Sequence, residues 1–381
     1  MEPTARARAE QGPPADGIPP LAGYTVAVAS DRRRHALAGL LESAGARTVG
    51  VQATCPVPQP DPAGLREATL RCLAGRSDEV VIASRFGLRR WLEAARRWGL
   101  ADPLVGRFAT ARLLSRDAAA ADGLRALGLT TIWSTAGATT EELLRYLMAQ
   151  PLPGRRIVVQ LDRPALRDVC DALRAGGADV IEVPTYRSDP PPHAMILRRL
   201  IDLAVRRQVD AVAFAGAPAA GHLLEQAERE GRLGDLLGAL RYGVPCWALG
   251  VVSGRELAER GVPVRYGERP YVEELAEAVL LALPERALRL TPSGHRLEVR
   301  GHAVVLDGRL VPVPVGPLAV LRALAAEPGR VLSPSQIRGA LPAGADVDDH
   351  AVEMAVSRLR RALAGIDIVQ TIVKRGYRLA T

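Results

Sequence analysis

The sequence has few of the features that mark membrane, secreted or metal-binding proteins. No apolar run approaches the roughly 20 residues that a membrane-spanning helix needs, and the first residues lack the basic and then apolar pattern of a secretion signal. The four cysteines show no CxxC spacing, and the six histidines form no metal-ligand pattern. We therefore expect a cytoplasmic protein with reduced cysteines, no metal and no membrane segment.

Lysine is almost absent, because Lys374 is the single lysine among 50 basic residues. An arginine-rich, lysine-poor chain is typical of a GC-rich bacterial genome, but it also suits an anionic partner such as nucleic acid or a polycarboxylate. The net charge is +8, and residues 285–381 alone hold 14 basic and nine acidic side chains. This concentration in a quarter of the chain favours DNA.

Length and pattern predict an α/β protein of two or three domains. Short apolar runs of strand character alternate with helical Ala/Leu/Arg stretches; the runs are 24–29, 79–83, 155–161, 179–184 and 210–216. This alternation predicts parallel sheets covered by helices on both faces. A faint internal repeat, LGL at 127–129 and RGV at 260–262, favours two similar lobes over one large sheet.

The remaining segments set the expected boundaries. Residues 1–20 are rich in Pro, Gly and charge, and we expect a disordered tail there. Residues 284–294 break the pattern and are expected to form a linker. After it, residues 295–315 alternate like strands around a predicted Asp307–Gly308 turn.

The stretch from Asp348 to Leu363 predicts an amphipathic helix, N-capped by Asp348 or Asp349. Its apolar face is expected to lie in a core and carries Val352, Ala355, Val356, Leu359 and Leu363. Its opposite face is left for a partner and carries His350, Met354, Ser357, Arg358 and Arg361. Alone, such a helix is usually a solvated surface.

Two shorter helices precede this helix, and a basic β-hairpin over 368–379 follows it. The two are separated at Glu327-Pro328-Gly329 and the second begins at Ser333. Three helices and a terminal hairpin predict a winged helix over 295–381. In that fold a helix enters the major groove of DNA while the wing reaches the phosphates.

Three motifs in order, EPGRVLSPSQI, DDHAVEMAVSRLRRAL and GYRL, resemble the OmpR/PhoB-type DNA-binding domain of bacterial response regulators. The resemblance implies double-stranded DNA as a partner, and it implies contacts to DNA from His350, Ser357, Arg358, Arg361 and the wing residues Lys374, Arg375 and Arg378. The wing reads TIVKRGY where that family has TVRG-x-GY, which bears on half-site preference. Nothing in the sequence fixes whether the protein binds DNA as a homodimer.

The acidic set of the receiver domain that usually precedes this DNA-binding domain is missing. Asp31 follows the first strand, but Arg32, Arg33 and Arg34 come next and make a poor magnesium site. Phosphorylation is therefore not the expected input.

Residues 21–283 instead resemble uroporphyrinogen-III synthase. The similar stretches occur in order: VVIASRFGLRRWLEA, GRRIVVQLDRPALRDVCDALRAGGADVIEVPTYRSDPP, DAVAFAGAPAAGHLLE, ALGVVSGRELAERGV and ERPYVEELAEAVL. The resemblance implies a two-lobed body of doubly wound parallel sheets, with an active cleft between the lobes and no cofactor or metal. It places lobe 1 at about 21–51 and 190–283 and lobe 2 at about 57–183.

That family closes a linear tetrapyrrole, hydroxymethylbilane, with inversion of its last ring. By the resemblance, Tyr186 is the candidate catalytic residue, because a phenol there could assist the leaving hydroxyl. Ser84, Arg85 and Ser253 are the implied substrate-binding residues, able to hold anionic carboxylates. Without the resemblance, a tyrosine just after a strand is usually a half-buried edge residue.

Several family turns have lost polar groups in this chain. The turn that usually reads Thr-Ser-x-Asn-Gly is 83–87, ASRFG; Gly-x-x-Thr-Ala is 117–121, DAAAA; and Phe-Ser-Pro-Ser is 215–218, AGAP. These losses favour a DNA-binding transcriptional regulator whose body senses a tetrapyrrole or other anionic small molecule, or docks a partner regulator. The alternative is an active uroporphyrinogen-III synthase fused to a DNA-binding domain, and a scaffold role is a third reading.

Overall fold

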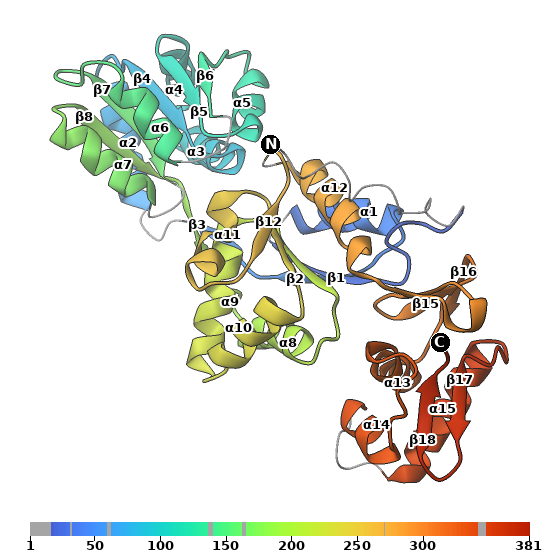
Figure 1. Cartoon of the computed structure of the whole chain (residues 1–381). Coiled ribbons are helices and arrows are strands. Elements are labelled where there is room, and N and C mark those ends of the chain that lie inside the picture. Colours follow the sequence, from blue (N-terminus) through green and yellow to red (C-terminus); the bar gives the residue numbers. More distant parts are fainter. Residues whose placement is uncertain are drawn as a thin grey trace, which may run out of the picture.

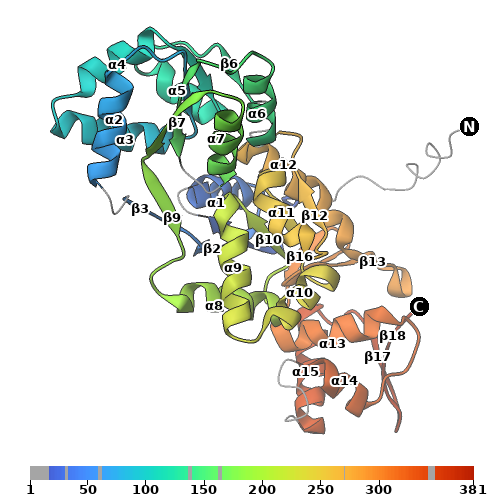
Figure 2. The same cartoon turned by 90° about the vertical axis from the view of Figure 1, so that its left-hand side faces the viewer.

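Two parallel sheets and a helical C-terminal domain account for the residues that the computed structural model describes, which are 17–30, 33–58, 62–135, 140–161, 165–269, 271–341 and 348–381. Figure 1 shows lobe 2, lobe 1 and the C-terminal domain following one another along the molecule, and Figure 2 shows the same succession from the side. The described helices include none long and apolar enough to cross a membrane.

Lobe 1 is a five-stranded parallel sheet in the order β12-β11-β10-β1-β2. Leu37 and Leu275 pack one face of the sheet from α1 and α12, while α8, α9, α10 and α11 cover the other. Its elements are β1 (Thr25–Ser30), α1 (Arg33–Ser43), β2 (Arg47–Gln52), α8 (Ala194–Val205), β10 (Ala211–Phe214), α9 (Ala217–Arg229), α10 (Leu233–Tyr242), β11 (Cys246–Ala248), α11 (Val251–Glu259), β12 (Val264–Tyr266) and α12 (Val272–Ala282).

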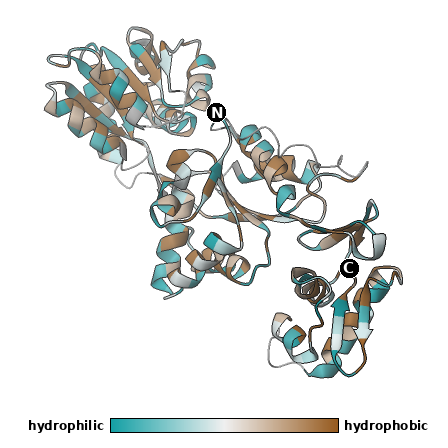
Figure 3. Ribbon diagram, in the orientation of Figure 1, coloured by the Kyte–Doolittle hydropathy of each residue, from teal (hydrophilic) through white to brown (hydrophobic). Residues whose placement is uncertain are grey.

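Lobe 2 is a second five-stranded parallel sheet, in the order β6-β5-β4-β7-β8. Helices α2 to α5 cover one face and α6 and α7 the other. Its elements are α2 (Pro62–Leu73), β4 (Glu79–Ile82), α3 (Arg85–Arg97), α4 (Ala101–Ala109), β5 (Arg112–Ser115), α5 (Ala118–Arg125), β6 (Trp133–Ser134), α6 (Thr140–Met148), β7 (Arg156–Leu161), α7 (Ala165–Ala175) and β8 (Asp179–Pro184). The helices carry hydrophobic and hydrophilic stretches side by side (Figure 3), as amphipathic helices on a sheet do.

The two sheets share one strand order, although the chain enters them at different points. Counted from β4, lobe 2 runs 3-2-1-4-5; counted from β10 and continued at β1, lobe 1 runs 3-2-1-4-5 as well. In sheets of this type ligands bind at the carboxyl ends of the strands, where the order reverses. In lobe 2 that point lies between β4 and β7.

A two-stranded antiparallel ribbon, β3 (Cys55–Pro58) and β9 (Tyr186–Asp189), carries the chain from lobe 1 to lobe 2 and back. Tyr186 therefore stands at the lobe 2 end of the ribbon, two residues after β8.

The C-terminal domain is a winged helix, as predicted, and a four-stranded antiparallel sheet precedes it along the chain. The sheet holds β13 (Leu288–Leu290), β14 (Leu297–Val299), β15 (Ala303–Leu306) and β16 (Arg309–Pro312), the helices are α13 (Val315–Ala326), α14 (Pro334–Ala340) and α15 (Asp349–Ala362), and the wing is β17 (Val369–Ile372) with β18 (Gly376–Leu379). The β15–β16 turn falls at Asp307–Gly308, with φ of 48° and 79°, as the DG pair predicts.

Two expected boundaries differ from the structure. Residues 284–294 are not a free linker, because they hold two short 3₁₀ turns and β13, whose residues pair with β14. The predicted tail lies mostly outside the described residues; residues 17–20 are described, and the carbonyl oxygens of Pro19 and Pro20 accept contacts from Arg300 of the C-terminal domain.

Candidate functional site

The exposed side of α15, which we call the recognition face, gathers the residues that the sequence assigned to DNA. Asp348 caps the helix by accepting from the Ala351 N–H at 2.8 Å, as predicted. The predicted core residues Val352, Ala355, Val356, Leu359 and Leu363 are all buried. The recognition face consists of His350, Met354, Ser357, Arg358 and Arg361, all exposed in the whole chain.

The wing places two cations at its tip. Lys374 has a φ of +58° and, like Arg375, is exposed at the turn between β17 and β18. Arg378 is half-buried, and its Nε donates to Gln370 Oε1 across the hairpin at 2.9 Å. Its position therefore makes it a brace of the wing as well as a cation.

Arg360, which the sequence did not single out, connects α15 to the wing. Its guanidinium donates to the Val369 carbonyl at 2.9 and 2.7 Å and to Thr371 Oγ1 at 2.8 Å. These bonds hold the wing against the recognition helix. The helical spacing could have indicated this position, because Arg360 lies on α15 between the buried face and the recognition face.

In lobe 2, Ser84 and Tyr186 meet at the carboxyl ends of the strands; we call the pair the hydroxyl cluster. Ser84 Oγ and Tyr186 OH lie 3.4 Å apart, and the Phe86 ring meets the Tyr186 ring edge-on with centroids 4.7 Å apart. Ser84 also caps α3, since its Oγ accepts from the Gly87 N–H at 3.1 Å. The serine hydroxyl is thus committed to the helix as well as to the phenol.

Gln160, fully buried in β7, fixes this turn. Its Oε1 accepts from the N–H groups of Ala83 and Ser84 at 2.8 and 3.1 Å. A Cβ on Gly87 would stand 1.8 Å from Gln160 Nε2, so position 87 has no room for another side chain. These contacts hold the turn at 83–87 in place.

Two helix N-termini, of α3 and α5, point to this edge of the sheet, and they differ in their occupancy. Asp117 caps α5 by accepting from the Ala120 N–H at 2.8 Å, and its carboxylate lies 3.5 Å from Arg116 Nη2. Arg116 is buried and donates to the Ala83 carbonyl at 3.0 Å. A carboxylate of the chain itself therefore caps the N-terminus of α5, whereas the N-terminus of α3 is capped by the neutral Ser84 hydroxyl and carries the exposed Arg85, which suits an anion.

Arg85 and Ser253 contribute in different ways. The Arg85 stem lies on α5, where a Cβ on Gly123 would approach its Cγ to 3.1 Å. Ser253 lies in α11 of lobe 1 and is only 7 % exposed. The structure brings together Ser84, Arg85 and Tyr186, while Ser253 belongs to the other lobe and is not joined to them by a contact among the described residues.

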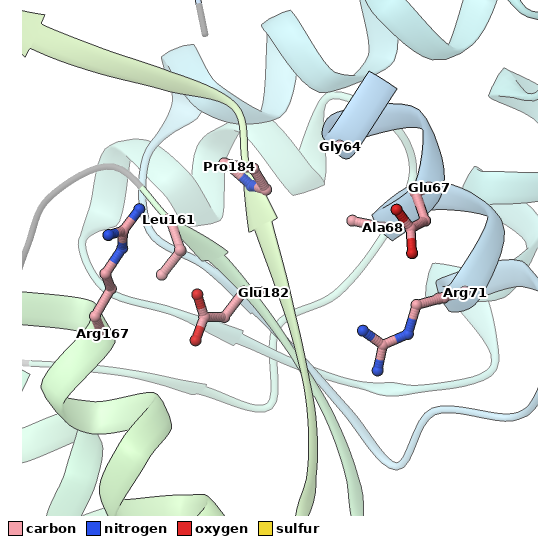
Figure 4. Close-up of a pocket in the computed structure, with 8 residues that line it drawn as sticks. All are labelled: Gly64, Glu67, Ala68, Arg71, Leu161, Arg167, Glu182 and Pro184. Carbon is pink, nitrogen blue, oxygen red and sulfur yellow. The ribbon is translucent and has the colours of Figure 1, made fainter. Parts of the chain in front are cut away.

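The pocket of about 230 Å³ shown in Figure 4 lies elsewhere on lobe 2 and contains none of the predicted site residues. It is lined by charged side chains, Arg167 and Glu182 on one side and Glu67 and Arg71 of α2 on the other. Within the described ranges no group of histidine, cysteine and acidic side chains could hold a metal ion.

Two of the buried cysteines are not poised as nucleophiles. Cys72, Cys170 and Cys246 are buried, and Cys55 is half-buried. Burial raises the pKa of Cys170 and of Cys246 to about 12, so these thiols stay protonated near neutral pH.

Comparison with known proteins finds two families. A family model described as uroporphyrinogen-III synthase HemD matches residues 35–277, and one described as transcriptional regulatory protein, C terminal, matches residues 310–379. A mutant uroporphyrinogen III synthase from the extremely thermophilic bacterium Thermus thermophilus is 28 % identical, with 69 % of this chain and 100 % of that one covered and a TM-score of 0.56.

Two further relatives are similar. The curated Bacillus subtilis (strain 168) protein YjjA, described as uncharacterized, is 25 % identical over 245 residues, which are 64 % of this chain and 89 % of that protein. The DNA-binding domain of Klebsiella pneumoniae RstA, in complex with the RstA box, is 23 % identical; 24 % of this chain and 96 % of that one are covered, with a TM-score of 0.21.

Proposed function

Because the chain belongs to the uroporphyrinogen-III synthase family and ends in a DNA-binding winged-helix domain of the OmpR/PhoB type, we propose that it is a transcriptional regulator. Its synthase-like body, which we assign to residues 21–283, binds a small anionic ligand or docks a partner regulator.

The recognition face carries this proposal. Ser357, Arg358 and Arg361 are exposed in the context of the whole chain, and the wing cations Lys374 and Arg375 are exposed beside them. Arginine on a major-groove helix reads guanine through two hydrogen bonds, while wing cations neutralise phosphates. A body that covered this surface would have argued against DNA as the partner.

The body supports binding more than turnover. Asp117 occupies the N-terminus of α5, and Ser84 caps α3, so the fold itself consumes groups that a synthase would direct to its substrate. What is left, Arg85 at the start of α3, suits a carboxylate-bearing ligand such as a tetrapyrrole.

The test is genome-wide mapping of the DNA bound by the full-length protein, followed by mobility-shift assays on the mapped sites. We expect discrete sites, with binding that weakens as salt rises because phosphate contacts release counterions. Uniform binding along the genome, or none at low ionic strength, would contradict the proposal.

One observation favours the alternative, an active uroporphyrinogen-III synthase. Tyr186 OH lies 3.4 Å from Ser84 Oγ at the expected edge of the sheet, so a phenol with a hydrogen-bonding neighbour is present. A coupled assay on fresh hydroxymethylbilane separates the two functions. Uroporphyrin III above the uncatalysed type I product, lost in Tyr186→Phe, would establish the enzyme; equal products from both proteins support the regulator.

A further inference from the structure

The turn between β14 and β15 of the DNA-binding domain lies in contact with lobe 1. This turn, Arg300–His302, lies against the amino ends of β1 and β10, at Gly23–Thr25 and Asp210; we call the contact the joint. The His302 N–H donates to the Gly23 carbonyl at 2.7 Å, and His302 Nδ1 lies 3.3 Å from Thr25 Oγ1. In Figure 1 the sheet with β15 and β16 accordingly lies beside the end of β1.

Arg300 is the centre of the joint. It is only 7 % exposed, and its Nη1 donates to the Ala22 carbonyl at 2.7 Å. Its Nε donates to Glu298 at 2.9 Å, and its guanidinium lies 5.7 Å from the centroid of the Tyr24 ring. The buried guanidinium thus has a carboxylate and a carbonyl as acceptors, and removing it would leave Glu298 with Arg289, whose Nε lies 3.6 Å from Glu298 Oε2, as its remaining ion-pair partner.

The chain is also closely packed on the other side of the turn. Asp210 Oδ2 accepts from the Thr25 N–H at 2.7 Å, and a Cβ on Gly301 would stand 1.8 Å from the same oxygen. Gly23 has a φ of +91°, and a Cβ there would lie 3.2 Å from Ala303 Cβ. The joint therefore needs glycine on both sides, at Gly301 in the turn and at Gly23 in lobe 1.

Arg322 of α13 ties the helical part of the domain to the same point. Its Nη2 donates to the carbonyls of Arg300 and Gly301 at 3.0 and 2.7 Å, and it lies 4.0 Å from Asp210 Oδ1. Burial raises the pKa of Asp210, while the Thr25 amide and the Arg322 charge act in the opposite direction. Helix, turn and sheet edge thus form one connected polar contact.

The recognition face lies away from this contact. Helix α15 and the wing are at the far end of the domain in both views (Figures 1 and 2), and the recognition-face residues are exposed with the body in place. Lobe 2 is attached differently, through the β3–β9 ribbon to lobe 1.

We propose that the joint locks the DNA-binding domain to lobe 1 as one rigid unit with its recognition face open, so that this protein is not regulated by covering its DNA-binding surface. Lobe 2, on its ribbon, is the part left to move. The inference rests on the DNA-binding role in the proposed function but not on the identity of any ligand.

The test compares full-length wild type with Arg300→Ala and Gly301→Ala, and with Arg309→Ala as the matched control, since Arg309 is an exposed arginine of the same sheet. Hydrogen exchange is followed at the amide of His302, which donates across the joint to the Gly23 carbonyl, and at the amide of Thr25, which donates to Asp210 on the lobe 1 side of the joint. We expect about tenfold faster exchange there in both joint variants, as a lost local hydrogen bond predicts, and wild-type exchange in Arg309→Ala. Unchanged protection in α15 shows that the domain is still folded.

Two further measurements decide whether the joint locks the DNA-binding domain to lobe 1. Small-angle scattering should give a broader distance distribution for the joint variants than for wild type and Arg309→Ala; the same distribution in all four proteins would overturn the lock. Affinity for a mapped DNA site should stay within about twofold of wild type, because the recognition face is already open. A several-fold gain in Arg300→Ala would instead establish masking and overturn the proposal. If no site can be mapped at all, the proposed function fails, while the scattering and exchange results still judge the lock.

Discussion

The recognition face and the hydroxyl cluster are both small sets of polar side chains found through sequence motifs, yet the fold uses them in opposite ways. On α15, Arg358 and Arg361 project from a helix whose other face is buried, and they are left for a partner. In lobe 2, Ser84 caps α3 and contacts Tyr186, so this polar side chain already has partners within the chain. A motif therefore indicates a function only after the local uses of its side chains are known.

The largest effect should come from removing the recognition face. In Arg358→Ala/Arg361→Ala, each lost guanine contact costs roughly 1–3 kcal/mol, so we expect about 100-fold weaker binding of a mapped site. Both positions are exposed and alanine favours helix, so the domain should stay folded. Mobility shifts over a salt series measure the loss.

The matched control is Tyr186→Phe, which should bind DNA as wild type does. If the double variant lost affinity equally for all sequences and only its salt dependence changed, the two arginines would be phosphate contacts and not base readers.

A smaller effect is expected from a substitution in lobe 2, which should lower thermal stability and leave DNA affinity unchanged. In Gly87→Ala the new Cβ would lie 1.8 Å from Gln160 Nε2 and 2.7 Å from Thr185 Oγ1. Such overpacking costs about 1–3 kcal/mol, so thermal unfolding of the body should begin at a lower temperature while DNA affinity is unchanged.

Gly106→Ala in α4 is the control, because nothing lies within 4 Å of a Cβ there. Alanine favours the helix at such a position, so its transition should not fall. A Gly87→Ala protein as stable as wild type would mean that the backbone at 83–87 shifts to accommodate the new methyl group without a loss of stability.

The outcome of the sequence predictions follows the same contrast. The faces of α15 were predictable, because burial on a helix repeats every 3.6 residues and needs only local sequence. The two-lobed body and its parallel sheets were also correct, since the central strands β1, β4, β7 and β10 are continuous apolar runs. Short strands such as β11 and β12, of three residues each, leave no such run and were missed.

Contacts between distant segments could not be derived. Gln160 is 77 residues from Ala83, whose N–H it accepts, and no local pattern relates the two. The joint is the extreme case, because Arg300 contacts Ala22 across 278 residues. Residues 284–294 break the pattern of strands and helices, which predicts a linker, yet the short strand β13 lies there. Pairing partners, and not propensity, define those elements.

A third and smaller effect is expected at Arg360, which links the two parts of the DNA-binding surface. Arg360→Ala loses the bonds to the Val369 carbonyl and Thr371 Oγ1, so the wing should loosen and DNA affinity fall about tenfold, the equivalent of roughly one charge-assisted hydrogen bond. Faster amide exchange in β17 and β18 separates this positioning role from a direct contact.

Arg360→Lys keeps the charge but not the forked geometry, so we expect it to restore little of the affinity. Full recovery in the lysine variant would show that Arg360 acts as a phosphate-binding cation and not as a brace.

The smallest effect should be a pH dependence of the joint through His302. Burial, and then the charge of Arg47, lower the pKa of His302 below its ordinary 6.5. The native state therefore binds this proton less readily than the unfolded chain does. The stability that neutral His302 contributes is present above pH 6.5 and is lost as the pH falls below that value.

Wild type should lose more thermal stability than His302→Gln between pH 7.5 and 5.5, a window chosen around the ordinary histidine pKa of about 6.5. The raised pKa of Asp210 acts in the opposite sense, with stability lost as pH rises, but it is common to both proteins and cancels in the comparison. Parallel melting curves would mean that His302 titrates alike in the folded and unfolded chain, and the joint would then owe its cohesion to Arg300 and the backbone alone.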